Sequence, residues 1–156
     1  MFLRDVRVLR RLPVPLLPLL ATDADVPWSR SDSASFIGIV PLWPIHQRNP
    51  VKRLIVSTYQ AASGAGAAAM EELRESTRAH LEDREFKNTV LPHPYAFNLF
   101  SHNSKVDPET GYNEEETKMI KETRKIFADP DIRISATCVR VPVLRAHSES
   151  LTFECD

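Results

Sequence analysis

The stretch at residues 54–70, LIVSTYQAASGAGAAAM, decides the fold of this chain. An apolar run leads into a polar segment that carries Gln60, and a Gly-rich turn and an Ala-rich helix start follow. This order delivers side chains and bare backbone N–H groups to one place, at the mouth of a helix. The stretch is therefore either a functional loop or only a tight corner between a strand and a helix.

A strand and a helix are expected on the two sides of this turn. Residues 51–58 predict a buried strand whose apolar centre is Leu54, Ile55 and Val56. Residues 67–81 predict a helix that packs through Ala69, Leu73, Thr77, Leu81 and the stem of Arg74. Its opposite face is expected in water and carries Glu71, Glu72, Glu75 and Arg78.

The second half of the chain continues the alternation. Residues 91–100 predict a loop that enters a strand, because Pro92 and Pro94 prevent regular structure earlier. Residues 107–111 predict a turn.

A second helix and a second long strand follow that turn. Asn113 and Glu116 form a capping-box pattern, and Asp129-Pro130 ends the helix. Its apolar stripe is Met119, Ile120, Thr123, Ile126 and Phe127. Residues 132–141 alternate apolar and polar side chains and predict a strand. Strands that alternate with helices favour an α/β or α+β fold, with helices packed on a mixed sheet.

Composition fits one soluble domain. The chain has 156 residues, 42% hydrophobic and 26% charged. Lys plus Arg is 20 and Asp plus Glu is 21, so no overall charge argues for nucleic acid or an anionic membrane as a partner. The two cysteines, Cys138 and Cys155, have no spacing typical of a metal site or a disulfide framework, which favours a reducing compartment.

The first fifty residues differ from the rest. Seven of the twelve prolines lie there, and each removes a backbone donor, so we expect regular structure to be interrupted over residues 1–50. Four arginines precede a ten-residue apolar run at 12–21, a pattern typical of a targeting segment and too short to span a bilayer. A poorly folded Pro-rich extension is the alternative. The folded domain is expected over residues 51–156.

Two segments carry candidate chemistry. Gly64, Gly66 and Ala69 satisfy the relaxed dinucleotide pattern G-x-G-x-x-A, but a polar segment separates the glycines from the strand. A free-standing Rossmann site is therefore not expected, although the glycines permit close approach by a phosphate or nicotinamide.

The second segment is RVPVLRAHSES, residues 140–150. Arg140 and Arg145 can clamp a carboxylate or phosphate, and His147 can transfer protons near neutral pH. The alternative is a solvated strand end with an incidental histidine. On the second helix, Glu115 and Lys118 lie three residues apart, which alone indicates a surface ion pair of little consequence.

Four segments together resemble one family. STYQAASGAG, AFNLFSH, GYNEEETKMIKETRKI and ATCVRVPVLRAHSES are similar in order and spacing to aspartate-semialdehyde dehydrogenase of the plant and bacterial type. The resemblance runs from about Val51 nearly to the C-terminus. It implies the catalytic and dimerisation domain of an oxidoreductase that makes L-aspartate semialdehyde from aspartyl phosphate with NADPH, on the route to lysine, threonine and methionine.

The resemblance also implies roles for individual residues. Gln60 matches the glutamine that orients the acyl group, Arg140 the arginine that holds the substrate carboxylate, and His147 the acid–base histidine. The helix pair at the substrate and phosphate site corresponds to Glu115 and Lys118. The loop that approaches NADP corresponds to Ser63, Gly64 and Gly66.

This sequence departs from the family pattern at both ends. The family's Gly-rich dinucleotide loop has no counterpart upstream, and the family chain continues beyond Asp156. Its nucleophile is a cysteine thiolate, and counting back from Gln60 by the family spacing reaches Ser33, whose hydroxyl is protonated at neutral pH. We therefore expect a domain truncated at both ends, without its Rossmann domain and inactive by itself.

Two hypotheses follow for what the chain does. The first is an enzyme subunit or fragment that binds a small-molecule substrate. The second is a non-catalytic dimerisation module or a truncated gene product. The expected partner is a second copy or a full-length homologue, without nucleic acid or membrane, in a plastid or the cytoplasm.

Overall fold

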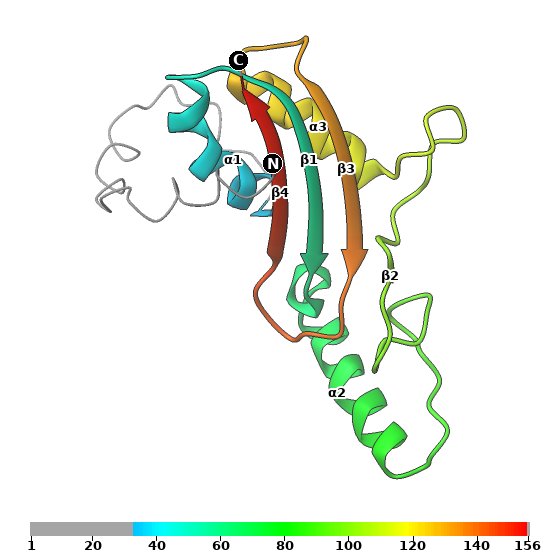
Figure 1. Cartoon of the computed structure of the whole chain (residues 1–156). Helices are drawn as coiled ribbons and strands as arrows, with labels where there is room; N and C mark the ends of the chain where they lie inside the picture. The colour runs from blue at the N-terminus through cyan, green and yellow to red at the C-terminus, as the bar shows by residue number, and fades with distance from the viewer. Residues whose placement is uncertain (1–32, 156) are drawn as a thin grey trace, which may run out of the picture.

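The computed structural model describes residues 33–155 (Figure 1). A four-stranded mixed sheet has the order β2-β3-β1-β4. β1 pairs in parallel with β3 and antiparallel with β4, and β2 pairs antiparallel with β3. The elements are α1 (Ser33–His46), β1 (Val51–Gln60), the 3₁₀ helix η5 (Ala62–Ala65), α2 (Ala67–Leu81), β2 (Phe100–Ser101), α3 (Glu114–Phe127), β3 (Arg133–Arg140) and β4 (Ser148–Cys155). The predicted α/β class is confirmed.

Helices cover one face of the sheet. α3 packs on β3, and α1 packs on α3, β1 and β4. Figure 1 shows α3 behind the strands and α1 to the left of β4, with no described helix in front of the strands. The core between the layers contains Ile39, Leu42, Leu54, Val56, Met119, Ile126, Phe127 and Ile132.

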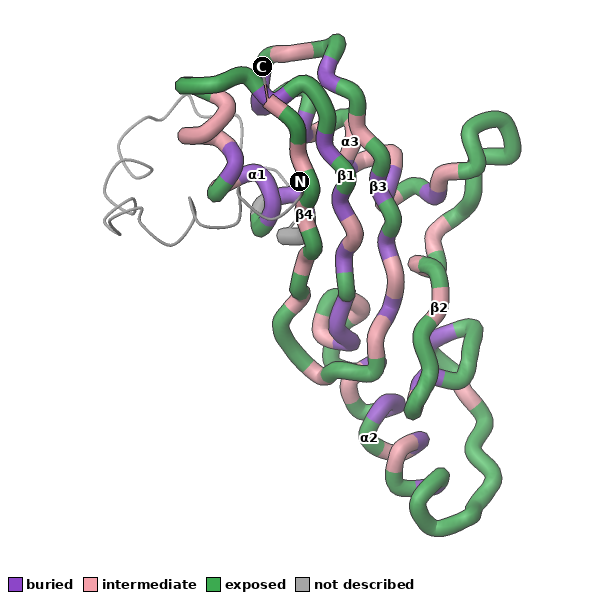
Figure 2. The backbone as a smooth tube through the Cα atoms, in the orientation of Figure 1, coloured by how far each residue is buried: buried purple, intermediate pink, exposed green. Residues whose placement is uncertain are grey.

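β1 is two residues longer than expected and is buried on one face only. Leu54, Val56 and Thr58 are buried, whereas Ile55 and Tyr59 are exposed (Figure 2). The prediction that Ile55 belongs to a buried centre is therefore wrong. An alternating strand buries every second side chain when helices cover only one face of its sheet.

α1 contradicts the expectation of irregular structure before residue 51. It is a 14-residue helix with Pro41 and Pro44 inside it. A proline in a helix interior costs about 3 kcal/mol, and full burial of a Leu or Ile contributes about 1.5–3 kcal/mol. Ile39 and Leu42 are both 2% exposed, so tertiary packing offsets much of that cost. Residues 1–32, with the basic start and the apolar run, lie outside the described residues.

α2 extends beyond the end of the sheet and packs differently from the expected pattern (Figure 1). Ala69 and Leu73 are buried as predicted, but Leu81 is 71% exposed. Glu72, which was expected in water, is buried and accepts backbone N–H groups of Thr89, Val90 and Leu91. Burial raises the pKa of Glu72, and these hydrogen bonds lower it by more, so the pKa lies below its usual value. One carboxylate thus ties the segment 82–99 to α2.

The capping box of α3 is confirmed. Asn113 Oδ1 accepts the Glu116 N–H at 2.9 Å, and Glu116 Oε2 accepts the Asn113 N–H at 2.9 Å. The other carboxyl oxygen of Glu116 accepts the Cys138 N–H at 2.9 Å, which fixes the start of α3 to β3. The predicted stripe is buried at Met119, Thr123, Ile126 and Phe127 and half-buried at Ile120.

β4 was not predicted. Its inward side chains, at Glu149, Leu151, Phe153 and Cys155, are only half-buried, and Glu149 begins the alternation with a charge. Only two strongly apolar residues therefore mark this strand in the sequence. Its pairing with β1 supplies the stability that its own pattern lacks.

Glu149 occupies an unusual place under α1. It lies in register with Thr58, and neither carboxyl oxygen has a hydrogen-bond partner among the described residues. A Cβ added at Gly38 of α1 would lie 2.5 Å from Glu149 Oε2, so the carboxylate would have to move to make room for it. Burial raises the pKa of Glu149 to about 7.

This raised pKa predicts a pH-dependent stability. A Glu side chain in an unfolded chain has a pKa of about 4.3, whereas the pKa of Glu149 in the folded chain is about 7. Between these two pH values, the folded chain therefore holds a proton that the unfolded chain has lost. The stability associated with neutral Glu149 is full below the unfolded pKa and is lost as pH rises through the folded pKa. Glu149→Gln is expected to raise the free energy of unfolding at pH 8 by up to about 3 kcal/mol, and by little at pH 4.5.

Urea unfolding of both chains across this pH range measures the effect. Glu154→Gln is the matched control, because Glu154 lies on the same strand, exposed and paired with Arg53 at 3.1 Å. It is expected to change stability by less than about 1 kcal/mol. Parallel stability curves for the parent and Glu149→Gln would contradict the prediction.

Candidate functional site

Gln60 and Arg140 lie side by side at the end of two parallel strands. They are the last register pair of β1 and β3, and only 2% and 4% of their surfaces are exposed. Equivalent positions on parallel strands point to the same face, here the face that the helices cover. The carboxyl ends of parallel strands are where ligands bind in open α/β sheets.

His147 reaches the same place from the loop between β3 and β4. The Ala61 N–H donates to His147 Nδ1 at 3.1 Å, so the neutral ring carries its proton on Nε2. A Cβ added at Gly64 would lie 2.8 Å from His147 Nε2 and 3.2 Å from Arg140 Nη1. Both side chains therefore lie against the bare face of Gly64. Ala146, at φ 71°, turns the chain immediately before the histidine.

Residues that the sequence did not identify hold Arg140. Its Nη1 donates to the Ala61 carbonyl at 3.4 Å, its Nε donates to Asn103 Oδ1 at 3.4 Å, and its Nη2 lies 2.8 Å from His102 Nε2. The buried Tyr95 donates to the Gln60 carbonyl at 3.4 Å. Tyr95, His102 and Asn103 lie in an irregular segment. Its signals in the sequence were the polar run SHNS directly after Phe100 and the segment AFNLFSH, which resembles the family but indicated no role for His102.

The loop of residues 61–66 does not offer bare N–H groups at the expected positions. The N–H of Ser63 donates to the Leu144 carbonyl, that of Gly64 to Ala61, and that of Gly66 to Ser63. These N–H groups are not left bare, because they already close η5 and bind the 140s loop, whereas the approach of a phosphate or nicotinamide to the glycines stays a prediction. Gly66, at φ 92°, faces open space.

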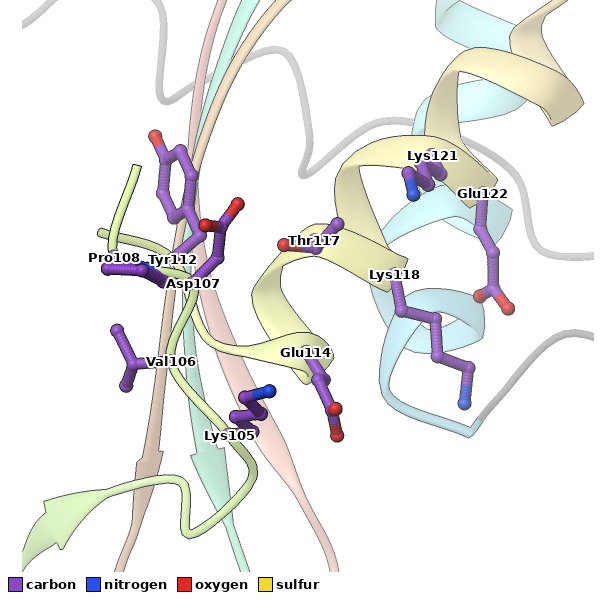
Figure 3. Close-up of a pocket in the computed structure, with 10 residues that line it drawn as sticks. All are labelled: Lys105, Val106, Asp107, Pro108, Tyr112, Glu114, Thr117, Lys118, Lys121 and Glu122. Carbon is purple, nitrogen blue, oxygen red and sulfur yellow. The ribbon is translucent and has the colours of Figure 1, made fainter. Parts of the chain in front are cut away.

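Glu115 and Lys118, the two candidates on α3, lie apart from the cluster formed by Gln60, Arg140 and His147. Lys118 lines a pocket of about 540 Å³ between the segment 105–112 and α3, together with Lys105 and Lys121 (Figure 3). Gln60, Arg140 and His147 do not line it. Glu115 approaches the cluster through its backbone, since its N–H donates to Ser104 Oγ at 3.4 Å.

The remaining candidates are not brought into the cluster. Arg145 is exposed, in contrast to Arg140, so the two guanidiniums do not share one environment. Ser33 is the first residue of α1, and its side chain lies outside the described residues. Burial raises the pKa of the Cys138 thiol to about 11, which keeps it protonated at neutral pH.

Residues 33–155 contain neither a cluster of metal ligands nor a helix that could span a membrane. No group of three or more His, Cys, Asp or Glu side chains there could hold a metal ion. In the same range, every helix is too short or too polar to cross a membrane.

Comparison with known proteins identifies the class. The model of the semialdehyde dehydrogenase dimerisation domain matches residues 42–156, and the chain belongs to this family. It is 58% identical over 115 residues to aspartate-semialdehyde dehydrogenase of Synechocystis sp., across 74% of this chain and 34% of that protein. The corresponding protein of Prochlorococcus marinus is 54% identical over 113 residues, across 72% of this chain and 33% of its own length.

A solved structure agrees. Aspartate semialdehyde dehydrogenase II of Vibrio cholerae, complexed with ASA, has a TM-score of 0.72 and 38% identity, covering 75% of this chain and 34% of that one. The resemblance found in the sequence is confirmed. The chain spans about a third of the length of the curated relatives it matches.

The close packing of His147 against Gly64 predicts the effect of adding a methyl group at this position. Gly64→Ala is expected to displace His147 or Arg140, because its Cβ would overlap the imidazole. The measurement is the ¹H–¹⁵N signal of the His147 ring, which should shift. Gly66→Ala is the control: it has open space but a left-handed φ, so it should cost about 1 kcal/mol of stability and leave that signal in place. An unchanged His147 signal in Gly64→Ala would refute the close packing.

Proposed function

We propose that this chain forms the substrate-binding part of an aspartate-semialdehyde dehydrogenase, which reduces aspartyl phosphate to L-aspartate 4-semialdehyde with NADPH. The observation that carries the proposal is the convergence of Gln60, Arg140 and His147 at the end of β1 and β3. The family membership and the relatives described above support the same activity.

Each of the three groups suits one task. Arg140 is buried and has a carbonyl, an amide and an imidazole among its partners at 2.8–3.4 Å, and its guanidinium can form a charge-assisted pair with a substrate carboxylate. No described residue accepts a hydrogen bond from Gln60 Nε2, which leaves that amide able to orient an acyl oxygen. His147 Nε2–H can donate a proton and take it back.

The cofactor contact is proposed at Ser63, Gly64 and Gly66. Gly64 and Gly66 are exposed, and the space over Gly66 is open, so the loop fits a surface contact with NADP rather than a phosphate cradle. NADPH would supply the hydride. We propose Lys118 and Glu115 as contributors to the phosphate side of the substrate, because Lys118 lines a pocket with two further lysines.

Catalysis by the chain alone is not expected. The family reaction needs a thiolate, the Cys138 thiol is buried with a raised pKa, and the position reached by the family spacing holds Ser33. A serine hydroxyl needs a dedicated base to attack an acyl phosphate. The proposal is therefore binding without turnover. A plastid or cytoplasmic location stays a prediction from the resemblance.

Calorimetry with L-aspartate 4-semialdehyde tests the binding role. Arg140→Gln is expected to weaken binding at least tenfold through loss of the charge-assisted pair, roughly 1.5–3 kcal/mol. Arg145→Gln, an exposed neighbour, should leave the affinity unchanged. In the same samples, phosphate-dependent reduction of NADP should be absent. Equal affinity of parent and Arg140→Gln would refute the assignment, and turnover that His147→Ala abolishes would refute inactivity.

A dimerisation role is the second candidate, and the uncovered sheet face favours it. Ile55 and Tyr59 are 37% and 41% exposed on that face. Their cross-strand neighbours and those of Ser57 are all uncharged: Ser135, Thr137, Val139, Ser148, Ser150 and Thr152. An uncharged face across three strands suits isologous packing of a second copy. A longer homologue with the same face would dock in the same way.

Light scattering after size-exclusion chromatography tests this face. The parent is expected to run as a dimer, and Tyr59→Arg as a monomer, because the substitution buries an unpaired charge in the interface. Leu81→Glu is the control, because Leu81 is 71% exposed and is the last residue of α2, outside the sheet. A monomeric parent, or a Tyr59→Arg variant that stays dimeric, would rule this face out.

A further inference from the structure

His102 lies between Arg140 and the start of α3. Its Nε2 is 2.8 Å from Arg140 Nη2, and its Nδ1 is 3.0 Å from Ser104 Oγ. Ser104 Oγ in turn accepts the Glu115 N–H at 3.4 Å. One imidazole and one hydroxyl therefore connect the end of β3 to the first turn of α3.

The chemistry of the partners fixes the form of the imidazole. A guanidinium offers only donors and does not lose a proton in proteins, so His102 Nε2 has to present its lone pair. The ring proton then sits on Nδ1 and is donated to Ser104 Oγ. That oxygen has two lone pairs and accepts from both His102 Nδ1–H and the Glu115 N–H. The Ser104 N–H also points to His102 Nδ1, at 3.3 Å, and by itself favours a lone pair there. The contact of Nε2 with the guanidinium is shorter, at 2.8 Å, and a guanidinium can only donate, so this contact decides for the Nδ1–H tautomer.

We propose that His102 is a positioning residue: as the neutral Nδ1–H tautomer, it fixes the plane of the Arg140 guanidinium and couples it to the first turn of α3. The proposal rests on the proposed function of Arg140 as the group that holds the substrate carboxylate.

The lengths of the hydrogen bonds explain why the one to His102 matters for the position of the Arg140 guanidinium. Arg140 Nη1 and Nε are directed to Ala61 and Asn103 at 3.4 Å, which are long hydrogen bonds. The contact with His102 is the shortest of the three and comes from the β2 side of the site. A guanidinium forms a bidentate pair with a carboxylate only in a fixed plane, so the His102 bond sets the direction of recognition.

The first experiment reads the tautomer directly. Long-range ¹H–¹⁵N NMR of the whole chain at pH 7.5 should show a protonated Nδ1 and an unprotonated Nε2 for His102. Ser104→Ala removes the acceptor of Nδ1–H and should reduce that tautomer's population. An Nε2–H ring in the parent would overturn the proposal. This result does not depend on substrate binding, so it stays decisive even if the proposed function fails.

The second experiment separates positioning from packing. His102→Gln places a carbonyl near the position of Nε2, whereas His102→Leu fills a similar volume without an acceptor. His102→Leu should weaken binding of L-aspartate 4-semialdehyde about tenfold and broaden the Arg140 Nε–H signal, and His102→Gln should stay within about threefold of the parent. In an Arg140→Gln background the His102 substitutions should have no further effect. Equal losses in both variants, or losses that persist in that background, would overturn the proposal. Should the parent bind no semialdehyde, the proposed function fails, and the Arg140 signal alone decides the role of His102.

Discussion

The hydrogen bonding of β1 on both of its edges is the constraint on which the rest of the structure depends. One edge pairs in parallel with β3 and brings Gln60 beside Arg140. The other pairs antiparallel with β4, so the chain has to cross beneath the end of β1 between these two partners, and that crossing carries His147. A parallel and an antiparallel neighbour on one strand thus gather three side chains from distant parts of the sequence.

The backbone of Ala61 is the second element that assembles the site. Its N–H holds His147, and its carbonyl accepts from Arg140. Gly64 lies against both side chains, and the N–H groups of Ala62, Ser63, Gly64 and Gly66 all donate to carbonyls of the protein. The loop is therefore a scaffold for neighbouring side chains more than a ligand cradle. Its glycine serves packing, which is a different reason for the residue from the one a dinucleotide pattern implies.

The sequence predicted those elements whose local pattern of apolar and polar residues agrees with their burial in the fold. β1, α2, α3 with its capping box and β3 all have strong periodicity, and the resemblance indicated Arg140. Errors arose where tertiary context decided the outcome. Ile55 is exposed because one sheet face is uncovered, and Glu72 is buried because a distant loop supplies three N–H donors. His102 could not be found, because its role depends on a contact across 38 residues within an irregular segment.

The alternation of β1 also limits how the length of this chain can vary. Val51 is tied to the end of α1 by its N–H bond to His46 Nδ1 at 3.1 Å, and Gln60 is tied to Arg140 by register. Inserting or deleting a single residue between them would turn Gln60 to the uncovered face and the uncharged side chains inward. Single-residue length changes are therefore restricted to segments outside the ladder, such as the exposed residues 82–87. The number of residues between the end of α1 and Gln60 can therefore change only by an even number if Gln60 is to stay on the same face of the sheet.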